Sequence, residues 1–417
     1  MDILTVEGGS KLRGTLAVSG SKNAALPVLI ATLLTDDPCT ITNVPDLRDI
    51  ETVISLLVFL GKQIARSGNS IEVKAGPTLY AEAPYELVRR MRASIVVVGP
   101  LLARLGHVKA SLPGGCAIGG RPINIHLDGF RALGAELQLE QGYVELRANQ
   151  LKGATIHLDF ASVGATENLM MAATLARGRT ILNNAAMEPE ISDLAAFLSA
   201  MGARIDGAGT ETLTIDGVSR LRGAAHRVVA DRIEAGTYMI AGALCGGELK
   251  LQGARLDHLA ALTAKLRQAG ADVDESGTDV VVRAPKRRNA VNVETAVYPG
   301  FPTDLQAQWM TLMTLADGVT QVSENVFENR FMHVAELQRM GADIQIKGNT
   351  ATIRGVETLS GADVMVSDLR AGAALVLGAL AASGKSVIHR VYHLDRGYEH
   401  LEKKLNAVGA RISRGQE

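Results

Sequence analysis

The pattern of apolar and polar positions switches repeatedly between a helical period and a strand period. Between 162 and 218, the stretch SVGATENLMMAATLARG predicts a helix rich in small residues, and RTILNNA predicts a strand. Apolar residues then follow the spacing of one helix face at Ile191, Leu194, Phe197, Leu198 and Met201. ARIDG and TLTIDGV alternate around a glycine-containing turn, which predicts a hairpin. This segment therefore predicts two helices and about four strands.

The same unit recurs six times along the chain. In each copy a helix-like stretch ends in a glycine and runs into a short strand, and the glycines are 68 to 73 residues apart. The six marker glycines are Gly61, Gly134, Gly202, Gly270, Gly341 and Gly409. Glycine fits the left-handed position that follows a helix. A fixed period of this kind indicates repeated supersecondary units, and accidental periodicity in an ordinary α/β chain is the less favoured alternative.

Each unit also contains one stretch rich in small apolar residues. These stretches lie at 22–34, 93–106, 162–178, 233–247, 304–318 and 370–384. Because small side chains allow close packing, we expect six helices packed tightly together inside a shell of strands. The predicted fold is therefore α/β, with two inside-out domains built from six βαβαββ repeats.

The order of elements at the two ends predicts how the units are shared between domains. Strands are expected at 2–9 and 14–20, whereas the chain closes on a helix and ARISRG, so the first strands should complete the last unit. One domain would span 21–229, and the other would combine 1–20 with 230–417. The two crossings, near 19–21 and 229–231, would form a hinge, and the cleft between the domains would hold the active site.

Composition narrows the class of protein. The chain has 417 residues with 43 Lys+Arg and 44 Asp+Glu, so no basic footprint for nucleic acid is present, and 4% aromatic residues do not suit a base-stacking platform. The apolar run from 24 to 34 is shorter than the about 20 residues that span a bilayer, and no secretory signal precedes it. We therefore expect a cytoplasmic protein with no nucleic-acid, membrane or obligate protein partner.

No metal or cofactor is indicated. The three cysteines, Cys39, Cys116 and Cys245, form no CxxC pair, and the nine histidines show no metal spacing. No phosphate-binding loop or GxGxxG after a strand is found, so ATP and NAD are not expected. Cys39 and Cys245 lie in apolar surroundings and are predicted to be core residues.

Two segments carry polar residues that suggest chemistry. SGSKN places Lys22 and Asn23 at the start of an apolar helix, where an anion is favoured, although Ser21 or Asn23 could be a simple cap beside a solvated lysine. LPGGCAIGGRP surrounds Cys116 with four glycines and is followed by Arg121. A thiol near arginine has more thiolate character and can act as an acid, base or nucleophile, and the alternative is a turn with an incidental cysteine.

Arginines and one acid complete the candidate chemistry. Arginines recur in loops and near helix starts, at Arg92, Arg121, Arg330, Arg370 and Arg396. Each alone is usually solvated or paired, but together with Lys22 they could bind phosphate and carboxylate in bidentate fashion. FPTDLQAQ puts Asp304 at a helix start, either as an ordinary cap or as a base toward a substrate hydroxyl.

These segments together resemble the enolpyruvyl transferase family, in particular its UDP-N-acetylglucosamine 1-carboxyvinyltransferases. The resemblance covers essentially the whole chain. It rests on SGSKNAALP, NVPDLRDIET, MRASI, LPGGCAIGGRP, SVGATEN, EPEISD, DRIEAGT, FPTDLQAQ, ENVFENRFMH, DLRAG and HLDRGYE, in family order. The fold of that family, two inside-out domains of three βαβαββ units each, agrees with the six repeats.

The resemblance implies transfer of the enolpyruvyl group of phosphoenolpyruvate to the 3′-hydroxyl of UDP-N-acetylglucosamine, with release of phosphate. This is the first committed step of peptidoglycan synthesis, so the resemblance also implies roles in cell-wall biogenesis, cell shape and division, and a target of fosfomycin. Cys116 would protonate the enol methylene, and it can form a covalent phosphoenolpyruvate adduct. Asp304 would take the proton of the sugar hydroxyl, and Lys22 and Arg396 would complete the catalytic set.

The resemblance also implies the binding residues. Phosphoenolpyruvate would be held by Lys22, Asn23, Arg121, Arg370 and Arg396, with Arg330 lining the same cleft. UDP-N-acetylglucosamine would contact Arg92, Arg121, Pro122, Ile123, Asn124, Ile125, Phe160, Ala161, Ser162, Val163, Asp304 and Val326. One departure is RPIN, where the family has RPxD, so that Asn124 stands where an acid would contact uracil. An amide still accepts and donates hydrogen bonds, so the change concerns nucleotide affinity rather than chemistry.

Three alternatives remain open at this point. A 5-enolpyruvylshikimate-3-phosphate synthase shares fold and donor, although the PGGC loop favours the sugar-nucleotide enzyme. A non-catalytic regulatory paralogue that binds UDP-N-acetylglucosamine would not need Cys116, Asp304 and Lys22. An RNA-end-processing protein on similar repeats is disfavoured by the neutral charge balance.

Overall fold

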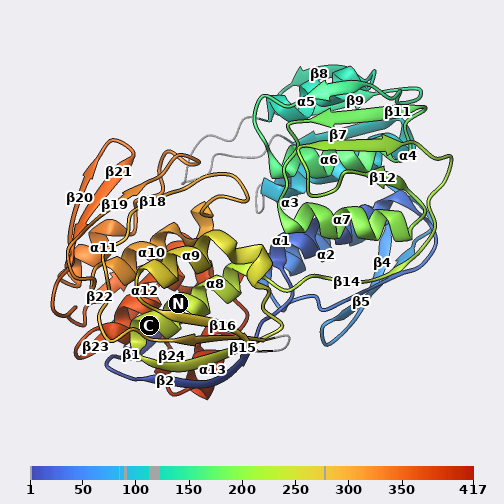
Figure 1. Ribbon diagram of the computed structural model, residues 1–417. Coiled ribbons are helices and arrows are strands. Elements are labelled where there is room, and N and C mark those ends of the chain that lie inside the picture. The colour runs from blue at the N-terminus through green and yellow to red at the C-terminus, as the bar shows by residue number, and fades with distance from the viewer. Residues whose placement is uncertain (1, 84, 89–91, 112–122, 277–278) are drawn as a thin grey trace. The chain divides into compact units, whose positions relative to one another are not determined.

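A computed structural model of the chain describes residues 2–83, 85–88, 92–111, 123–276 and 279–417 (Figure 1). The described residues form two compact units. The central unit consists of residues within 20–229, and the terminal unit combines residues within 2–19 and 230–417.

The central unit contains twelve of the described strands. They are β3 (Cys39–Thr42), β4 (Lys62–Ser67), β5 (Ser70–Ala75), β6 (Glu82–Ala83), β7 (His107–Ser111), β8 (Glu136–Glu140), β9 (Tyr143–Arg147), β10 (Thr155–His157), β11 (Arg179–Asn183), β12 (Arg204–Asp206), β13 (Thr212–Asp216) and β14 (Ala225–Arg227). Its helices are α1 (Lys22–Ala31), η1 (Thr32–Leu34), α2 (Arg48–Phe59), α3 (Tyr85–Val88), η2 (Arg92–Val97), α4 (Val98–Leu105), α5 (Asn124–Ala132), α6 (Val163–Ala173) and α7 (Pro189–Ala200).

The terminal unit also has twelve described strands, and its described helices likewise include both α-helices and 3₁₀-helices. Its strands are β1 (Asp2–Glu7), β2 (Leu12–Ala17), β15 (Gly247–Gln252), β16 (Asp272–Ser276), β17 (Asp279–Arg283), β18 (Val293–Glu294), β19 (Val319–Ser323), β20 (Asp343–Lys347), β21 (Thr350–Arg354), β22 (Asp363–Met365), β23 (Lys385–His389) and β24 (Arg411–Gln416). Its helices are α8 (Arg232–Cys245), η3 (Leu256–Leu259), α9 (Ala260–Gln268), η4 (Thr303–Leu305), α10 (Gln306–Met313), α11 (Val334–Arg339), α12 (Leu369–Ala381), η5 (Val391–Arg396) and α13 (Leu401–Ala407).

The strands form six four-stranded sheets of one topology. The orders are β14-β3-β5-β4, β6-β7-β9-β8 and β10-β11-β13-β12 in the central unit, and β2-β15-β17-β16, β18-β19-β21-β20 and β22-β23-β1-β24 in the terminal unit. In every sheet the first pair is parallel and the other pairs are antiparallel. The predicted fold class, α/β with six repeated units, is confirmed.

The marker glycines have the conformation that their position requires. Each of the six has a φ between 90° and 105°, in the left-handed region where a side chain is strained. Each follows the second helix of its unit, so the glycine ends the helix and turns the chain into the hairpin.

Three strands complete sheets that lie far away in sequence. β1 pairs with β23 and β24 and so completes the last unit, as predicted. The prediction is wrong for the second N-terminal strand, because β2 pairs in parallel with β15 and completes the fourth unit. In the central unit, β14 pairs with β3 and completes the first unit. Two sheets, one in each compact unit, therefore take their outer parallel strand from a distant part of the chain, whereas the other four take it from the segment just before β7, β11, β19 or β23.

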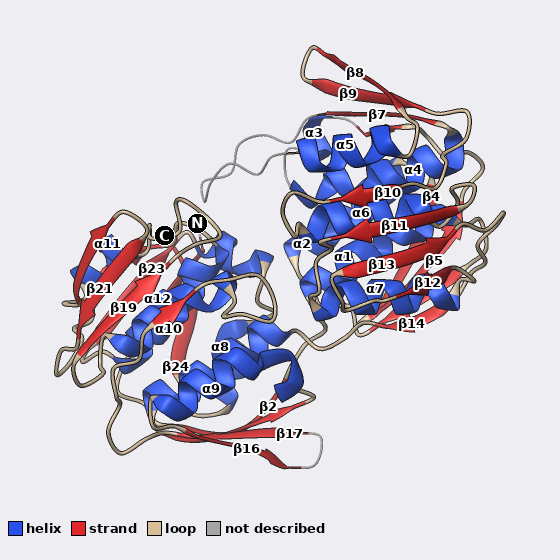
Figure 2. Ribbon diagram, turned by 45° about the horizontal axis from the view of Figure 1, so that its top comes forward, coloured by secondary structure: helices blue, strands red, loops and turns tan. Residues whose placement is uncertain are grey.

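The small-residue helices form the interior of each unit. In α1, α6, α8, α10 and α12 nearly every residue is buried, as expected for helices that are surrounded on all sides. In the terminal unit α8, α10 and α12 pack against one another. Figure 2 shows α8 and α9 lying along the sheet that contains β16 and β17, which both helices contact.

One predicted inner helix is shorter than expected. Residues 93–106 begin as the 3₁₀-helix η2, and the α-helix α4 starts only at Val98. Pro100 explains the break, because a proline in a continuous α-helix would clash with the carbonyl of the residue four positions earlier. Over the parts of the chain that the structure covers, no helix is long and apolar enough to cross a membrane.

Candidate active site

The helix α1 holds Lys22 in a buried ion pair. Ser21 is the helix cap, since its side chain accepts a hydrogen bond from Ala24 N. Lys22 is only 8% exposed, and its Nζ lies 3.2 Å from Oδ2 of Asp49 on α2. The alternative of a solvated lysine beside a cap is therefore wrong for Lys22, although the cap itself is present. Asn23 follows it and is half-buried.

The residues predicted to contact the nucleotide lie on two neighbouring segments of the central unit. Ile123, Asn124 and Ile125 lie at the start of α5, where Asn124 is exposed. The 160–163 segment leads into α6, which Ser162 caps by accepting from Ala165 N. Gly164 lies so close to the His126 ring that an added Cβ would be 3.5 Å from it. Helices α5 and α6 therefore pack against each other near their N-terminal ends.

Three predicted residues, Cys116, Arg121 and Pro122, lie outside the described residues, and so does the side chain of Arg92, whose backbone begins η2. Their roles stay predictions.

The central unit and the terminal unit each contain one buried histidine, His126 and His333, close in sequence to predicted site residues. Burial lowers the pKa of His126 to about 4, and Nδ1 of its ring lies 3.1 Å from Nδ2 of Asn168. Burial also lowers the pKa of His333 to about 4, three residues after Arg330. Both rings are therefore neutral in the folded protein at pH 7, and they stay neutral until the pH falls to about 4.

These two histidines predict that the fold loses stability in mild acid. The unfolded chain protonates a histidine near pH 6.5, whereas the folded chain does not do so until about pH 4, so acid favours the unfolded state. The contribution is complete above pH 6.5 and is lost as the pH falls toward 4, and at pH 5 we expect each histidine to lower the free energy of unfolding by about 2 kcal/mol. Urea unfolding at pH 5 and pH 7.5 measures this, and His126→Gln and His333→Gln should each reduce the difference. The half-exposed His107 provides the control, and equal pH dependence in all variants would contradict the assignment.

In the terminal unit the carboxylate of Asp304 lies between two buried arginines. Oδ1 accepts from Nη2 of Arg330 at 2.7 Å, and Oδ2 accepts from Nη2 of Arg370 at 2.9 Å. The two guanidinium side chains are 5% and 3% exposed, whereas Asp304 is 26% exposed. Asp304 lies in η4 and not at the cap of α10, so the simple-cap alternative does not describe it. Three residues from distant parts of the sequence thus form one charged cluster with a net positive charge.

The cluster keeps hydrogen-bond donors to spare. Burial opposes the charge of Arg370, but Asp304 and the other neighbouring groups outweigh it and raise its pKa, so the side chain stays cationic. Nε and Nη1 of Arg370 and Nη1 of Arg330 are buried without a hydrogen-bond partner among the described residues. Because an unpaired buried donor is costly, this arrangement favours an added anion with several oxygens.

A network of buried polar side chains contacts Asp304 and Arg370 and holds them in place. Nε2 of Gln308 donates to the backbone oxygen of Asp304 at 3.1 Å and to Tyr398 Oη at 3.0 Å. The hydroxyls of Tyr398 and Thr237 lie 3.0 Å apart, and the guanidinium of Arg370 lies over the Tyr398 ring at 5.4 Å. Arg396 belongs to η5, which packs against α12, and it lies two residues before Tyr398.

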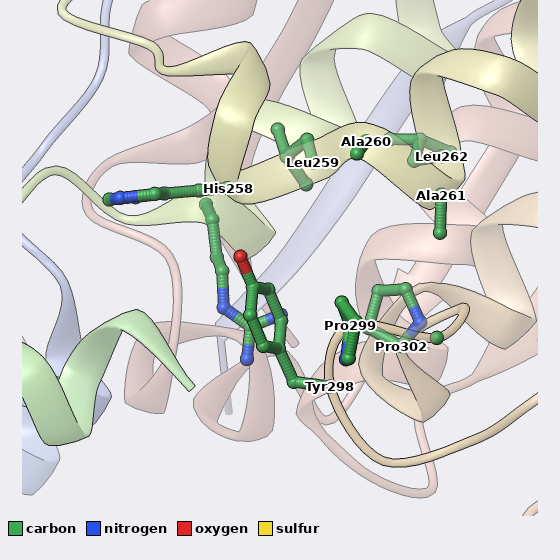
Figure 3. Close-up of a pocket in the computed structure, with 10 residues that line it drawn as sticks. His258, Leu259, Ala260, Ala261, Leu262, Tyr298, Pro299 and Pro302 are labelled. Carbon is green, nitrogen blue, oxygen red and sulfur yellow. The ribbon is translucent and has the colours of Figure 1, made fainter. Parts of the chain in front are cut away.

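A small pocket lies in the same unit, and one of its lining residues, Pro302, comes two positions before Asp304. Figure 3 shows residues 258–262 on one side and Tyr298, Pro299 and Pro302 on the other. The guanidinium of Arg232 lies over the Tyr298 ring at 5.5 Å. None of the predicted site residues lines this pocket.

Sequence reasoning missed several residues that support the site. The missed residues are Gln308, Tyr398, Thr237 and Asp49. All four lie within the motifs quoted above, yet none was singled out as a site residue. For Gln308 and Thr237 the available signal is a polar residue on a helix that is otherwise largely apolar, whereas Asp49 and Tyr398 carry no such signal. Within the described ranges no group of three His, Cys, Asp or Glu side chains could hold a metal ion.

Comparisons with known proteins agree with this chemistry. The family described as EPSP synthase (3-phosphoshikimate 1-carboxyvinyltransferase) matches residues 6–405. A UDP-N-acetylglucosamine 1-carboxyvinyltransferase of Geobacter metallireducens is 57% identical over 417 residues, which is 100% of both chains. A protein of the same name from Trichlorobacter lovleyi is 57% identical over 418 residues, again with 100% of both chains covered.

Solved structures show the same fold. The enolpyruvyl transferase NikO from Streptomyces tendae superimposes with a TM-score of 0.90 at 27% identity, covering 100% of this chain and 99% of that one. An EPSP synthase from Acinetobacter baumannii gives a TM-score of 0.77 at 18% identity, with 100% of each chain covered. The second similarity concerns the fold alone.

Proposed function

The chain belongs to the EPSP synthase family of carboxyvinyltransferases, and on that premise we propose that it transfers the enolpyruvyl group of phosphoenolpyruvate to the 3′-hydroxyl of UDP-N-acetylglucosamine. Phosphate is the second product. The observation that carries this proposal is the 57% identity, over the full length of both chains, with carboxyvinyltransferases that are named for this sugar nucleotide.

The reaction is an addition followed by an elimination. Asp304 accepts the proton of the sugar hydroxyl, whose oxygen bonds to the central carbon of phosphoenolpyruvate, while Cys116 gives a proton to the methylene carbon. The bond from the central carbon to the phosphate oxygen then breaks, the methyl group returns a proton to the Cys116 thiolate, and the double bond forms again. Phosphate leaves with the electron pair of the broken bond, so no oxidant, metal or cofactor is needed for the balance.

Charge in the terminal unit suits the anionic donor. Arg330 and Arg370 stabilise Asp304 as the carboxylate that a base must be, and their remaining donors suit the phosphate and carboxylate of phosphoenolpyruvate. Arg396 is assigned to the same anion, together with Arg121, Asn23 and Lys22 from the central unit.

The sugar nucleotide is assigned to the ends of α5 and α6. The residues are Arg92, Arg121, Pro122, Ile123, Asn124, Ile125 and the 160–163 segment, with Asp304 and Val326 from the terminal unit. The exposed Asn124 and the 47% exposed Phe160 ring suit contact with a base and a sugar. We also propose that the enzyme works in the cytoplasm and takes part in cell-wall biogenesis. Fosfomycin is proposed as its inhibitor. Its partners in this proposal are these two small molecules.

Phosphate release tests the proposal. The purified chain is given phosphoenolpyruvate with either UDP-N-acetylglucosamine or shikimate-3-phosphate, and we expect release only with the sugar nucleotide. Release only with shikimate-3-phosphate would identify a 5-enolpyruvylshikimate-3-phosphate synthase instead. No release with either, combined with a rise in melting temperature on adding UDP-N-acetylglucosamine, would indicate a regulatory binding protein.

A further inference from the structure

The turn after β19 differs from the same turn in the other repeats. In five of the sheets, the described residue after the outer parallel strand donates its N–H to the last residue of the neighbouring strand, as Thr295 does to Ser323 at 2.9 Å. This register makes the next residue, Glu324, equivalent to Asn43, Asn184, Gly253 and Arg390. The second repeat has its equivalent position outside the described residues.

Those four residues share a backbone conformation that Glu324 does not have. Their φ angles lie between 55° and 77°, and Glu324 has no positive φ. In two repeats the residue is an asparagine whose amide donates to the backbone of the neighbouring strand end, at 2.8 Å to Val228 O and at 2.7 Å to Leu158 O. The usual residue at this turn is therefore a local structural one.

The position across the ladder has changed as well. Thr295 is equivalent to Val18, Leu158, Val228 and Val366, which are all aliphatic. Thr295 is fully buried, and its hydroxyl donates to Oε1 of Glu324 at 2.8 Å. Two buried polar residues thus replace the usual pair in the one repeat that holds both Asp304 and Arg330. Because burying a carboxylate is costly, such a paired departure points to a function.

The carboxylate of Glu324 binds two segments of the Asp304 cluster, Thr303 next to Asp304 and the 326–327 backbone near Arg330. Oε2 accepts from the hydroxyl of Thr303, the residue before Asp304, at 2.8 Å. Oε1 accepts from the backbone N–H groups of Val326 and Phe327, at 2.9 and 3.0 Å. The Phe327 ring lies under the guanidinium of Arg330, 5.2 Å from its centre, and Arg330 in turn binds Asp304.

We propose that Glu324 is a positioning residue, which fixes the placement of Asp304 and Arg330 and of the turn that carries Val326. It touches neither substrate in this assignment. Through Thr303 it orients the base, and through the 326–327 backbone it orients both the arginine that pairs with the base and a residue assigned to the sugar nucleotide. This inference rests on the proposed function of Asp304.

The repeats supply the test. Glu324→Asn introduces the residue that two other repeats use at this turn, so the fold should be retained, but the side chain is too short to keep all four contacts. We expect kcat to fall about 10- to 100-fold, since a small misplacement of a reacting group has an effect of this size, and KM for UDP-N-acetylglucosamine to rise about threefold or more. Glu324→Gln keeps the length and one acceptor oxygen and should recover most of the rate.

Two further variants make the result decisive. Gly253→Asn changes the same turn of the fourth repeat, where a Cβ meets nothing within 4 Å, and should have the rates of the unsubstituted enzyme. Thr303→Val removes only the contact on the side of Asp304, so we expect a loss in kcat with little change in KM. It also serves as the test if Glu324→Asn does not fold, as judged by circular dichroism.

The outcomes separate the two proposals. If folded Glu324→Asn has the kcat and KM of the unsubstituted enzyme, the role of Glu324 is overturned and the proposed function still stands. If Glu324→Asn does not fold, the same result in Thr303→Val has the same meaning. Equal losses in Glu324→Asn and Glu324→Gln, with equally lowered melting temperatures, would also overturn it in favour of a structural role. Failure of the unsubstituted chain to release phosphate would overturn the function itself.

Discussion

Asp304→Asn should lower kcat by about 10²- to 10⁴-fold, the range expected when a general base is lost. Asparagine has nearly the same shape and keeps one oxygen for Arg330 or Arg370, but it cannot take the proton of the sugar hydroxyl. The two arginines would keep their charge without the balancing carboxylate. We therefore expect KM for phosphoenolpyruvate to stay the same or to fall, because the anion then meets a more positive site.

A matched substitution separates this effect from general damage. Asp304 comes just before helix α10, and Asp317 follows the same helix. Asp317 forms an exposed ion pair with Arg287, so Asp317→Asn should leave kcat unchanged. Unpaired buried charge should lower the melting temperature of Asp304→Asn but not of the control. A variant that folds less stably yet turns over at the normal rate would show that Asp304 holds the two arginines and is not the base.

Cys116→Ala should lower kcat by a similar factor, about 10²- to 10⁴-fold, because no other group is assigned to protonate the methylene carbon. Cys116→Ser should be nearly as impaired, since a hydroxyl is a far weaker acid than a thiol. Turnover of Cys116→Ala at the normal rate near neutral pH would remove the acid role.

The other two thiols allow the same point to be tested chemically. Cys39 is 1% exposed and burial raises its pKa, while burial raises the pKa of Cys245 to about 12. Neither should form the thiolate that reacts with iodoacetamide near pH 7.5. One alkylated thiol per chain should therefore suffice to inactivate the enzyme, and the variant with both Cys39→Ala and Cys245→Ala should be equally active and equally sensitive. Inactivation that disappears in this double variant would mean that a buried thiol had reacted.

Local signals in the sequence predicted much of the fold. The helical and strand periods, and a glycine that must take a positive φ, repeat in every unit and depend only on neighbouring residues. The order of elements correctly assigned β1 to the last sheet, but it assigned β2 to that sheet as well and gave no partner for β14, because the choice between distant strands leaves no local pattern. The shortened α4 was predictable in principle, since Pro100 was visible, but the rich apolar pattern around it outweighed that single residue.

Individual site residues were easier to name than to place. The arginines and Asp304 were found as polar residues in loops and helix starts, but nothing local shows that Arg330 and Arg370 bind the two oxygens of one carboxylate. The burial of Lys22 depends on Asp49, which is a full helix away, and the supporting role of Gln308 depends on Tyr398 near the other end of the chain. Such pairings are set by tertiary packing.

The pairing of β1 with β24 has a consequence for biosynthesis. Residues Asp2–Glu7 are paired along their length with Arg411–Gln416, so the sixth sheet cannot close until residues 411–416 have left the ribosome. All strands of the three central sheets lie within 39–227, so the central unit can fold during translation. Strand β1 is therefore made long before its partner β24, and a nascent chain in which the central unit has folded still carries an unpaired β1.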